Sequence, residues 1–399
     1  MKSFEDFGLS SHMLNTIKKL GFVEPTEIQQ EAIPYALSGK DVIGESATGS
    51  GKTLVFGCGI IENIDSDSGL QALILTPTRE LAEQVKDSLI QIANNRKIRI
   101  MAVYGGVAIN PQISALERAN IVVATPGRLL DHLSRGTINL SDIKFFVLDE
   151  ADRMFDMGFI DDVEKIIKAC PKKRQTLFFS ATISHRVKQL ANKHMKNPEI
   201  VSVQKNVDPS KLKQIYYDVR DNMKLSLLVT LLQKKNNGLS MIFCNTRKIT
   251  DFVAKNLKAN GISASAIHGG LSQASRSKTL KAFDDTRVKV LVCTDVAARG
   301  LDISHVATIY NYNLPKDPTD YVHRIGRTAR AGKYGEVVNL LSSPDHDFFA
   351  RILRDHSDFN IDREIMPETK KITIVSEGAK KVMFRGKKNF HRSRRPRRY

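Results

Sequence analysis

One short loop carries the residue types needed to bind the phosphates of a nucleotide. Residues 46–53, Ser-Ala-Thr-Gly-Ser-Gly-Lys-Thr, follow the apolar stretch 41–44 and precede a helix-like segment. The glycines would leave backbone N–H groups open to phosphate, and Lys52 would add a positive charge. The hydroxyl of Thr53 would reach a magnesium ion. Because the generic pattern has glycine at position 46, this loop is a variant form. The same pattern can occur by chance in a surface turn, but its position after a strand favours nucleotide binding.

An acidic pair ends a second strand-like segment. The run 145–148, Phe-Phe-Val-Leu, is followed by Asp149 and Glu150. Asp149 could hold a metal ion through water, and Glu150 could polarise the attacking water. An isolated acidic pair is commonly a surface cluster, but here it follows a phosphate loop in the same chain. The loop and the pair together predict a nucleoside-triphosphate hydrolase.

The elements that must position these residues indicate an α/β fold that occurs twice. Apolar, β-branched runs of four to six residues alternate with helix-like stretches along the chain. This alternation predicts doubly wound parallel sheets whose strands are covered on both faces. Most runs end in polar or charged residues, where open α/β sheets bind their ligands. A polar stretch, residues 204–210, separates the two halves and predicts a linker.

The positive charge of the chain is concentrated at its end. The net charge is +18, and residues 380–399 contain ten lysines and arginines and no acidic residue. Such a segment buries too little apolar surface to fold alone, so we expect it to be disordered. It could act as a solubilising tail or a targeting signal. A polyanion-binding arm is favoured, because basic blocks release counterions from phosphate backbones.

Cysteine usage and hydropathy predict the compartment. The four cysteines, Cys58, Cys170, Cys244 and Cys293, lack metal-ligand spacing and predict reduced, mostly buried thiols. The first residues lack the apolar core of a signal peptide, and no apolar run approaches the roughly 18 residues of a membrane span. We therefore expect a soluble, cytoplasmic protein with no membrane partner.

Further segments resemble, in their order, the motifs of the DEAD-box RNA helicases, which are ATP-dependent members of helicase superfamily two. The resemblance covers roughly residues 4–345 and begins with Gly-Phe, Pro-Thr and Ile-Gln pairs within residues 21–29. In that family the segment recognises adenine: the glutamine amide reads the base edge and an aromatic ring stacks on the base. Gln29 alone would more commonly be an exposed helix residue. The resemblance implies ATP and Mg²⁺ as ligands, with the metal held by Thr53 and Asp149. The implied nucleotide-binding positions are Phe4, Phe22, Thr26, Gln29, Ser46, Ala47, Thr48, Gly49, Ser50, Gly51, Lys52, Thr53, Gly300 and Asp302.

Other matching segments are those that grip the RNA backbone in this family. Arginines and helix-start amides suit this task because both are phosphate ligands. Each could instead be a capped helix start, and the glycine pair at 105–106 could be a simple turn. The implied RNA-binding positions are Pro77, Arg79, Gly106, Thr125, Gly127, Arg128, Thr246, Arg247, Gln273, Arg276 and Thr294.

The segment 323–330, His-Arg-Ile-Gly-Arg-Thr-Ala-Arg, resembles the family's arginine fingers. Arg327 and Arg330 would reach the γ-phosphate from the second domain, because the guanidinium fork matches phosphoryl oxygens. His323 would support the cleft. Evenly spaced arginines could otherwise be a solvated helix face. The positions that couple nucleotide state to strand separation are implied to be Asp152, Ser180, Thr182 and Arg324. Two departures from the family keep small residues: Ser-Ala at 46–47 in place of Ala-Gln, and alanine at 329 in place of glycine.

The resemblance implies two tandem RecA-like domains and an RNA-stimulated ATPase that locally unwinds short RNA duplexes and remodels RNA or ribonucleoprotein. The implied divisions are an ATP-binding domain over 1–205 with the adenine segment at 4–30, a linker over 206–211, a C-terminal helicase domain over 212–365, and a basic, disordered tail over 366–399. We expect a monomer that binds single-stranded and short duplex RNA, with tail-enhanced affinity. Partners in ribonucleoprotein or ribosome assembly are also expected.

Two other function classes stay open. One is a superfamily-two ATPase that translocates on DNA, which DNA-stimulated hydrolysis without a response to RNA would indicate. The other is a non-catalytic RNA clamp that uses the nucleotide only as a conformational lock. Intact Lys52, Glu150 and Arg327 argue against the clamp.

Overall fold

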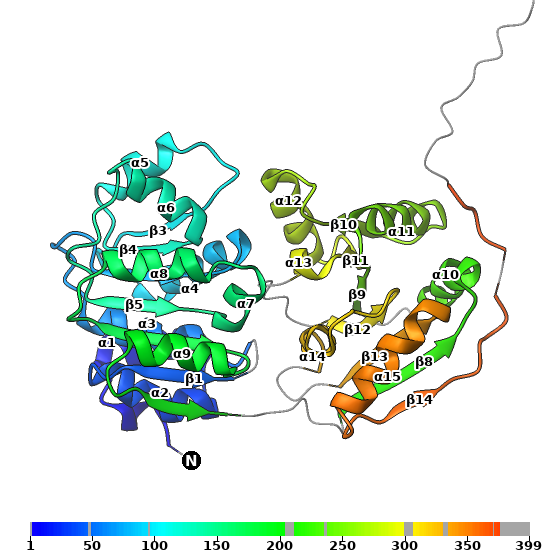
Figure 1. Cartoon of the computed structure of the whole chain (residues 1–399), viewed down its shortest axis with the longest axis horizontal. Coiled ribbons are helices and arrows are strands. Elements are labelled where there is room, and N and C mark those ends of the chain that lie inside the picture. The colour runs from blue at the N-terminus through cyan, green and yellow to red at the C-terminus, as the bar shows by residue number, and fades with distance from the viewer. Residues whose placement is uncertain are drawn as a thin grey trace, which may run out of the picture.

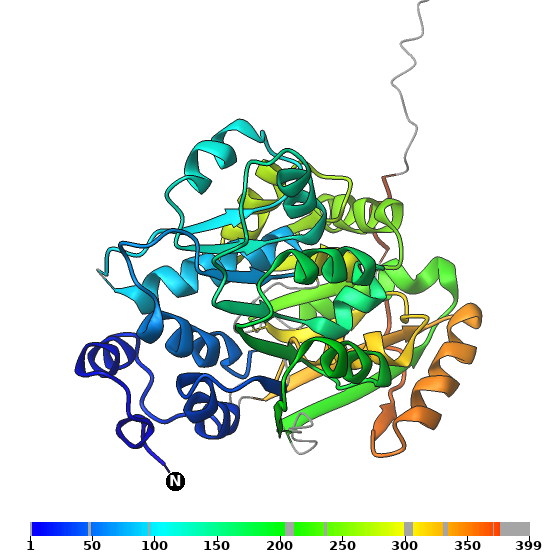
Figure 2. The same cartoon turned by 60° about the vertical axis from the view of Figure 1, so that its left-hand side comes forward.

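The computed structural model describes residues 2–46, 49–94, 96–203, 211–234, 238–298, 306–329, 334–369 and 371–375. Within these ranges the chain forms two α/β domains, each built on one seven-stranded parallel sheet (Figure 1). In the turned view the first domain lies in front of the second (Figure 2). The residues at 47–48, 204–210, 299–305 and 330–333, and those from 376 onward, lie outside the described ranges.

The strands of the first domain are short, apolar and buried. In sheet order they are β3 (Ile100–Val103), β4 (Ile121–Ala124), β2 (Ala72–Leu75), β5 (Phe145–Leu148), β6 (Gln175–Ser180), β1 (Val42–Glu45) and β7 (Glu199–Ser202). All neighbouring strands pair in parallel. The register aligns their carboxyl ends, with Leu75 opposite Leu148. The residues that follow these strands therefore meet at one edge of the sheet.

Helices cover both faces of this sheet. They are η1 (Phe4–Phe7), α1 (Ser11–Lys19), α2 (Glu27–Leu37), α3 (Lys52–Asn63), α4 (Arg79–Ala93), α5 (Asn110–Leu116), α6 (Pro126–Ser134), α7 (Ala151–Asp156), α8 (Ile160–Ala169) and α9 (His185–His194). Successive strand residues pack into different cores: Ile74 lies in one cluster and Leu73 and Leu75 in the other. Burial on both faces explains why the strand sequences are continuously apolar.

The second domain repeats the strand order of the first. Its strands are β10 (Ala264–Ile267), β11 (Val290–Cys293), β9 (Leu239–Phe243), β12 (Val306–Asn311), β13 (Gly335–Leu341), β8 (Leu212–Asp218) and β14 (Ile361–Arg363). Each strand number exceeds that of its counterpart in the first sheet by seven. The helices are η3 (Asp221–Met223), α10 (Lys224–Lys234), α11 (Arg247–Ala259), α12 (Gln273–Asp284), α13 (Asp295–Ala298), α14 (Pro318–Ile325), η5 (Ser343–Asp345) and α15 (His346–Asp355).

The predicted fold class, two tandem doubly wound parallel sheets, is confirmed. The predicted start of a disordered tail at residue 366 is too early. Met366 and Ile372 pack against the second-domain core, and Thr373 and Val375 are hydrogen-bonded to α11. Composition did not reveal this because the anchoring groups lie on a distant helix. Among the described residues, no helix combines the length and apolarity that a membrane crossing would need.

Candidate active site and nucleic-acid interface

The phosphate loop joins the carboxyl end of β1 to the start of α3. Gly51 is the N-cap of α3 with φ of 90°, a left-handed conformation that favours glycine. Lys52, the first helical residue, is buried, and its Nζ donates to the Ser46 carbonyl at 2.8 Å. The hydroxyls of Ser46 and Ser50 are 2.7 Å apart. The lysine is thus held at a helix N-terminus, where backbone N–H groups favour phosphate. The predicted ligands Ala47 and Thr48 lie outside the described residues.

The predicted adenine segment packs directly on this loop. Thr26 begins α2, and its hydroxyl donates to the Ser50 carbonyl at 2.8 Å. Gln29 accepts from the Thr26 N–H at 2.9 Å and donates to the Gly51 carbonyl at 3.1 Å. A Cβ at position 51 would lie 2.1 Å from Gln29 Nε2, so this contact also requires glycine. Both ends of the Gln29 amide bond to protein, so Gln29 links the segment to the phosphate loop. Its contact with adenine stays a prediction.

The two predicted stacking aromatics differ in exposure. Phe4 is buried and meets Phe7 edge to face, with ring centroids 5.9 Å apart. Phe22 is 42% exposed. The structure therefore places Phe4 as a core residue that supports the segment, while Phe22 can offer a ring face to a base.

The acidic pair lies at the end of β5, buried beside the phosphate loop. Asp149 Oδ1 accepts from the Glu150 N–H at 3.0 Å, and Glu150 adopts φ of 52°. A left-handed non-glycine residue costs free energy and is concentrated at functional sites. Burial, together with the charge of Glu150, raises the pKa of Asp149 to about 6, although nearby Lys52 opposes the shift. Glu150 Oε2 lies 3.3 Å from Arg153 Nη1, but no described group donates a hydrogen bond to it.

These groups fit a magnesium ion and a reactive water. Within the described ranges, no three His, Cys, Asp or Glu side chains form a metal cage. Mg²⁺ commonly uses one or two protein ligands and completes its shell with water and substrate phosphates. A buried carboxylate at Asp149 and the Thr53 hydroxyl match that donor set. The free Glu150 oxygen is available to accept a proton from water.

A hydrogen-bond network joins the acidic segment to the Ser-Ala-Thr turn after β6. Asp152 Oδ2 accepts from the N–H groups of Ala181 and Thr182 at 3.1 and 3.2 Å and from the Thr182 hydroxyl at 3.4 Å. Ser180 Oγ accepts from the Asp152 N–H at 3.2 Å and donates to the Thr182 carbonyl at 2.8 Å. The three residues predicted to couple nucleotide state to strand separation are therefore in direct contact.

Sequence reasoning missed Glu45, the last residue of β1. Its carboxylate accepts from the Ile183 N–H at 2.9 Å and from the Ser202 hydroxyl at 2.5 Å. It therefore ties the phosphate loop to the Ser-Ala-Thr turn and to the end of β7. No signal in the sequence singles it out, because its partners lie far along the chain.

In the second domain, Arg324 is 1% exposed and binds Asp295 through two bonds of 2.6 and 2.7 Å. It also donates to the Asn311 side chain at 2.8 Å and the Asn313 carbonyl at 2.6 Å. All of these partners belong to its own domain, so Arg324 organises the second-domain edge. Its predicted link to the first domain would have to act through that edge.

The arginine-finger segment lies at the end of α14. Arg327 is 3% exposed, and both ring nitrogens of His323 are buried without a hydrogen-bond partner among the described residues. Ala329 adopts φ of 52°, which explains the preference for glycine there. Gly300, Asp302 and Arg330 lie outside the described residues, so their roles stay predictions.

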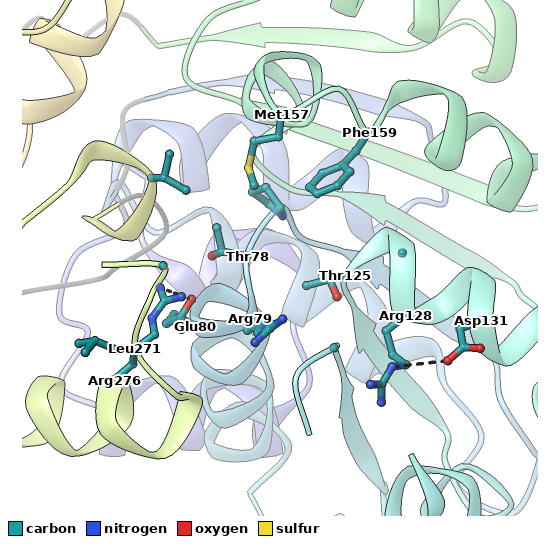
Figure 3. A pocket seen from close by; sticks show the side chains of 15 residues that line it. Thr78, Arg79, Glu80, Thr125, Arg128, Asp131, Met157, Phe159, Leu271 and Arg276 are labelled. Carbon is teal, nitrogen blue, oxygen red and sulfur yellow. Dashed lines mark ion pairs between the residues drawn. The ribbon is translucent and has the colours of Figure 1, made fainter. Parts of the chain in front are cut away.

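A cavity of about 500 Å³ separates the two domains (Figure 3). Predicted RNA-binding residues from the first domain line one side, and Arg276 from α12 lines the other. Figure 3 also shows Met157 and Phe159 at one end, an apolar part that the sequence did not suggest. The lining residues from the predicted set are Pro77, Arg79, Thr125, Gly127, Arg128 and Arg276.

Arginines in this cavity are held by the backbone around them. A Cβ at Gly106 would lie 2.0 Å from Arg79 Nη1, so the glycine turn makes room for the guanidinium. Arg128 donates to the Val107 carbonyl at 3.0 Å and lies 3.8 Å from Asp131. Arg79 and Arg128 therefore present positive charge to one cavity, as phosphate binding requires.

The second-domain positions of the predicted RNA set do not all face the cavity. The Thr246 hydroxyl caps α11 by accepting from the Ile249 N–H at 3.2 Å. Arg247 lies beside the turn at Gly269, where a Cβ would be 3.4 Å from Nη2. Thr294 follows β11, and its carbonyl accepts from the first turn of α13.

Two further predicted RNA contacts instead bridge the domains. Gln273 donates to Glu80 Oε1 at 3.0 Å, and Arg276 Nη2 lies 3.0 Å from Glu80 Oε2. Glu80, in the first turn of α4, was not predicted to act in this way. Gln273 and Arg276 therefore hold the domains together beside the cavity, and only Arg276 lines it.

Comparison with known proteins gives the family. Residues 26–190 match the DEAD/DEAH box helicase family, and residues 223–332 match the helicase conserved C-terminal domain. The chain is 45% identical over 343 residues to the DEAD-box ATP-dependent RNA helicase CshA of Bacillus subtilis, covering 85% of this chain and 69% of CshA.

Two solved structures share the fold. A DEAD box protein from Methanococcus jannaschii is 41% identical, with a TM-score of 0.55 over 91% of this chain and 99% of its own. Saccharomyces cerevisiae Dbp5 bound to RNA and ADP BeF3 is 33% identical, with a TM-score of 0.84 over 91% of this chain and 96% of its own. The chain therefore belongs to the DEAD-box family of ATP-dependent RNA helicases.

Proposed function

We propose that ATP hydrolysis by this protein is stimulated by RNA and drives local unwinding of short duplexes and remodelling of RNA or ribonucleoprotein. The observation that carries the proposal is the cavity between the domains. It is lined by Arg79, Arg128 and Arg276, which come from both sheets. A nucleic-acid strand seated there would contact both domains at once, so its binding and the closure of the domains are linked.

The hydrolytic step follows from the buried groups beside the phosphate loop. Lys52 and the N-terminus of α3 would hold the β- and γ-phosphates. Thr53 and Asp149 would hold Mg²⁺, which when bound neutralises charge on the phosphates. Glu150 would accept a proton from the attacking water. Arg327, from the second domain, would stabilise the charge of the transferred phosphoryl group.

Specificity for the RNA backbone rather than for sequence follows from the cavity chemistry. Guanidinium groups and backbone N–H groups contact phosphates, which carry no base information. The arrangement of the domains supports a closed state. The TM-score is 0.84 to Dbp5 bound to RNA and ADP BeF3 but 0.55 to the archaeal protein, although the latter is more identical in sequence. A strand bent to fit between closed domains would not fit a continuous duplex.

We also propose a cytoplasmic monomer whose basic tail adds RNA affinity. The four cysteines are free and buried, and burial raises the pKa of Cys58 and Cys244 to about 12. Such thiols suit a reducing compartment. The ten basic residues after position 379 would add phosphate contacts that weaken with salt.

The test of the proposed function is Glu150→Gln, with Glu117→Gln, an exposed position of the first domain, as the matched control. We expect Glu150→Gln to bind ATP and RNA normally while single-turnover phosphate release falls by about 10²–10⁴, the usual contribution of a general base. Release as fast as in the control would contradict the role of Glu150. Turnover stimulated by DNA and not by RNA would contradict the substrate class.

A further inference from the structure

Two asparagines on α11 clamp an extended segment at the end of the described chain. This segment, residues 371–375, is called the strap. Asn260 accepts from the Thr373 N–H at 3.0 Å and donates to the Thr373 carbonyl at 2.8 Å. Asn256 accepts from the Val375 N–H at 2.6 Å and donates to the Val375 carbonyl at 3.3 Å. Each side-chain amide thus satisfies both backbone groups of one strap residue.

The helix and the strap match in spacing. Two residues four apart on a helix are separated by about 6 Å along its axis. Alternate residues of an extended chain are separated by about 6.6 Å, so neighbouring clamps can hold them without strain. The amides are also fixed in advance, because Asn256 donates to the Phe252 carbonyl and Asn260 to the Asn256 carbonyl, both at 2.8 Å. The clamp therefore recognises an extended backbone whatever its sequence.

The clamp gives the strap a direction. Thr373 bonds near the end of α11 and Val375 bonds one turn earlier, so the strap runs antiparallel to the helix, toward Arg247. In Figure 1 the segment after β14, orange and red, runs along the outside of the second domain past α10 toward α11. Arg247 precedes Asn256 by nine residues, about 13.5 Å of helix. Lys380 follows Val375 by five residues, which can span up to about 17 Å.

Charge alone would not hold a basic tail in this place. The exposed side chains of α11 include Arg247, Lys248, Lys255 and Lys258. They would repel the ten lysines and arginines of residues 380–399. An uncharged amide clamp, supported by the packing of Met366 and Ile372 on the core, holds the chain against this repulsion. The two basic groups can be neutralised together only by a polyanion.

We propose that Asn256 and Asn260 form a tail anchor, which delivers the basic residues from Lys380 onward to the end of α11 that carries Thr246 and Arg247. The tail and the helix then bind one RNA phosphate backbone together. This inference rests on the proposed RNA-binding function. Without the clamp the tether to Lys380 would begin at Met366, so it would lengthen from five residues to fourteen. Effective concentration falls roughly as the −3/2 power of tether length, which predicts about fivefold weaker binding by the tail.

The test uses proline in the strap, because Asn256 is fully buried and its replacement could unfold α11. Thr373→Pro with Val375→Pro removes both N–H donors and leaves the helix unchanged. Ile374→Pro is the matched control, since its exposed residue supplies neither donor. Affinity for a fluorescent single-stranded oligouridylate is measured across a range of KCl concentrations, in the full chain and in a chain ending at Ala379.

In the full chain, we expect the double proline variant to bind about three- to fivefold more weakly than the control at low salt, with a smaller dependence on salt. In the chain ending at Ala379, the same substitutions should change nothing. Equal affinities of the double variant and the control in the full chain would overturn the anchor, as would an equal loss in both chains. If deletion of residues 380–399 changes neither affinity nor salt dependence, the tail has no RNA role and the anchor is wrong. RNA-stimulated ATP turnover of the same proteins reports separately on the proposed function.

Discussion

A single carboxylate, Glu45, connects three parts of the nucleotide site. It is the residue before the phosphate loop, and it accepts from Ile183 after the Ser-Ala-Thr turn and from Ser202 at the end of β7. The backbone N–H of Val203 also donates to its carbonyl, at 2.8 Å. Movement of the phosphate loop would therefore be felt at the turn and at the exit toward the second domain.

We expect Glu45→Ala to weaken ATP binding by about tenfold, because two donors lose a charged acceptor worth roughly 1.5–3 kcal/mol each and the loop loses its support. Glu45→Gln is the conservative control. Its amide can still accept from Ile183 and donate to Ser202 Oγ, so its ATP affinity should stay near that of the parent. Equilibrium binding of a fluorescent ATP analogue measures both. Equal affinities of the alanine and glutamine variants would show that Glu45 does not position the loop.

Residue types and spacing predicted the phosphate loop and the acidic pair, because these motifs are local in the chain. The contacts of Glu45 and Glu80 were missed, because their partners are distant in sequence. Burial of Phe4 and the engagement of Gln29 by Gly51 were also beyond reach. Motif spacing indicates which groups meet at a sheet edge but not which of them bond to one another.

Among the elements of the second domain, the edge of the sheet is organised around one buried arginine. Arg324 on α14 bonds to Asp295 at the start of α13 and to Asn311 at the end of β12. Its guanidinium also lies over the Phe243 ring at the end of β9, 5.0 Å from the centroid. The elements that carry the predicted arginine fingers are thereby fixed to the sheet.

We expect Arg324→Met to lower the free energy of unfolding of the second domain by about 3–5 kcal/mol, the cost of leaving one partner of a buried ion pair alone. Arg351→Met, at an exposed position of α15 in the same domain, should change it little. Urea unfolding followed by far-ultraviolet circular dichroism measures the difference. Equal stability of the two variants would contradict the structural role of Arg324.

Strands were the most predictable elements, since burial on both faces requires continuous apolar runs such as 121–124 and 290–293. The strap was the least predictable. It is polar and largely exposed, and its order depends on two asparagines more than a hundred residues earlier. Local composition therefore indicated disorder for residues that side chains of another element hold in place.

Across the whole molecule, Glu80 connects the two domains beside the RNA cavity. Its carboxylate is 4% exposed and receives Gln273 and Arg276 from α12. Because one carboxylate of the first domain meets two donors of the second, the contact forms only when the domains are closed. Closure and completion of the cavity are thus one event.

We expect Glu80→Gln to weaken RNA binding in the presence of an ATP analogue by about tenfold, since it removes an ion pair but keeps the hydrogen bond to Gln273. Basal ATP binding should be unchanged. Glu83→Gln, one turn later on α4, is the matched control, because Glu83 bonds to Lys86 and Tyr104 within the first domain. An equal effect of the two substitutions would show that the domain contact does not support RNA binding.

The central claim is that the second domain supplies a catalytic group to a nucleotide held by the first. Its most direct test is single-turnover phosphate release by Arg327→Ala at saturating ATP and RNA, with Arg351→Ala as control. The account predicts a rate lower by about 10³ or more, as for loss of an arginine finger, with ATP binding retained. Release as fast as in the control would contradict the claim.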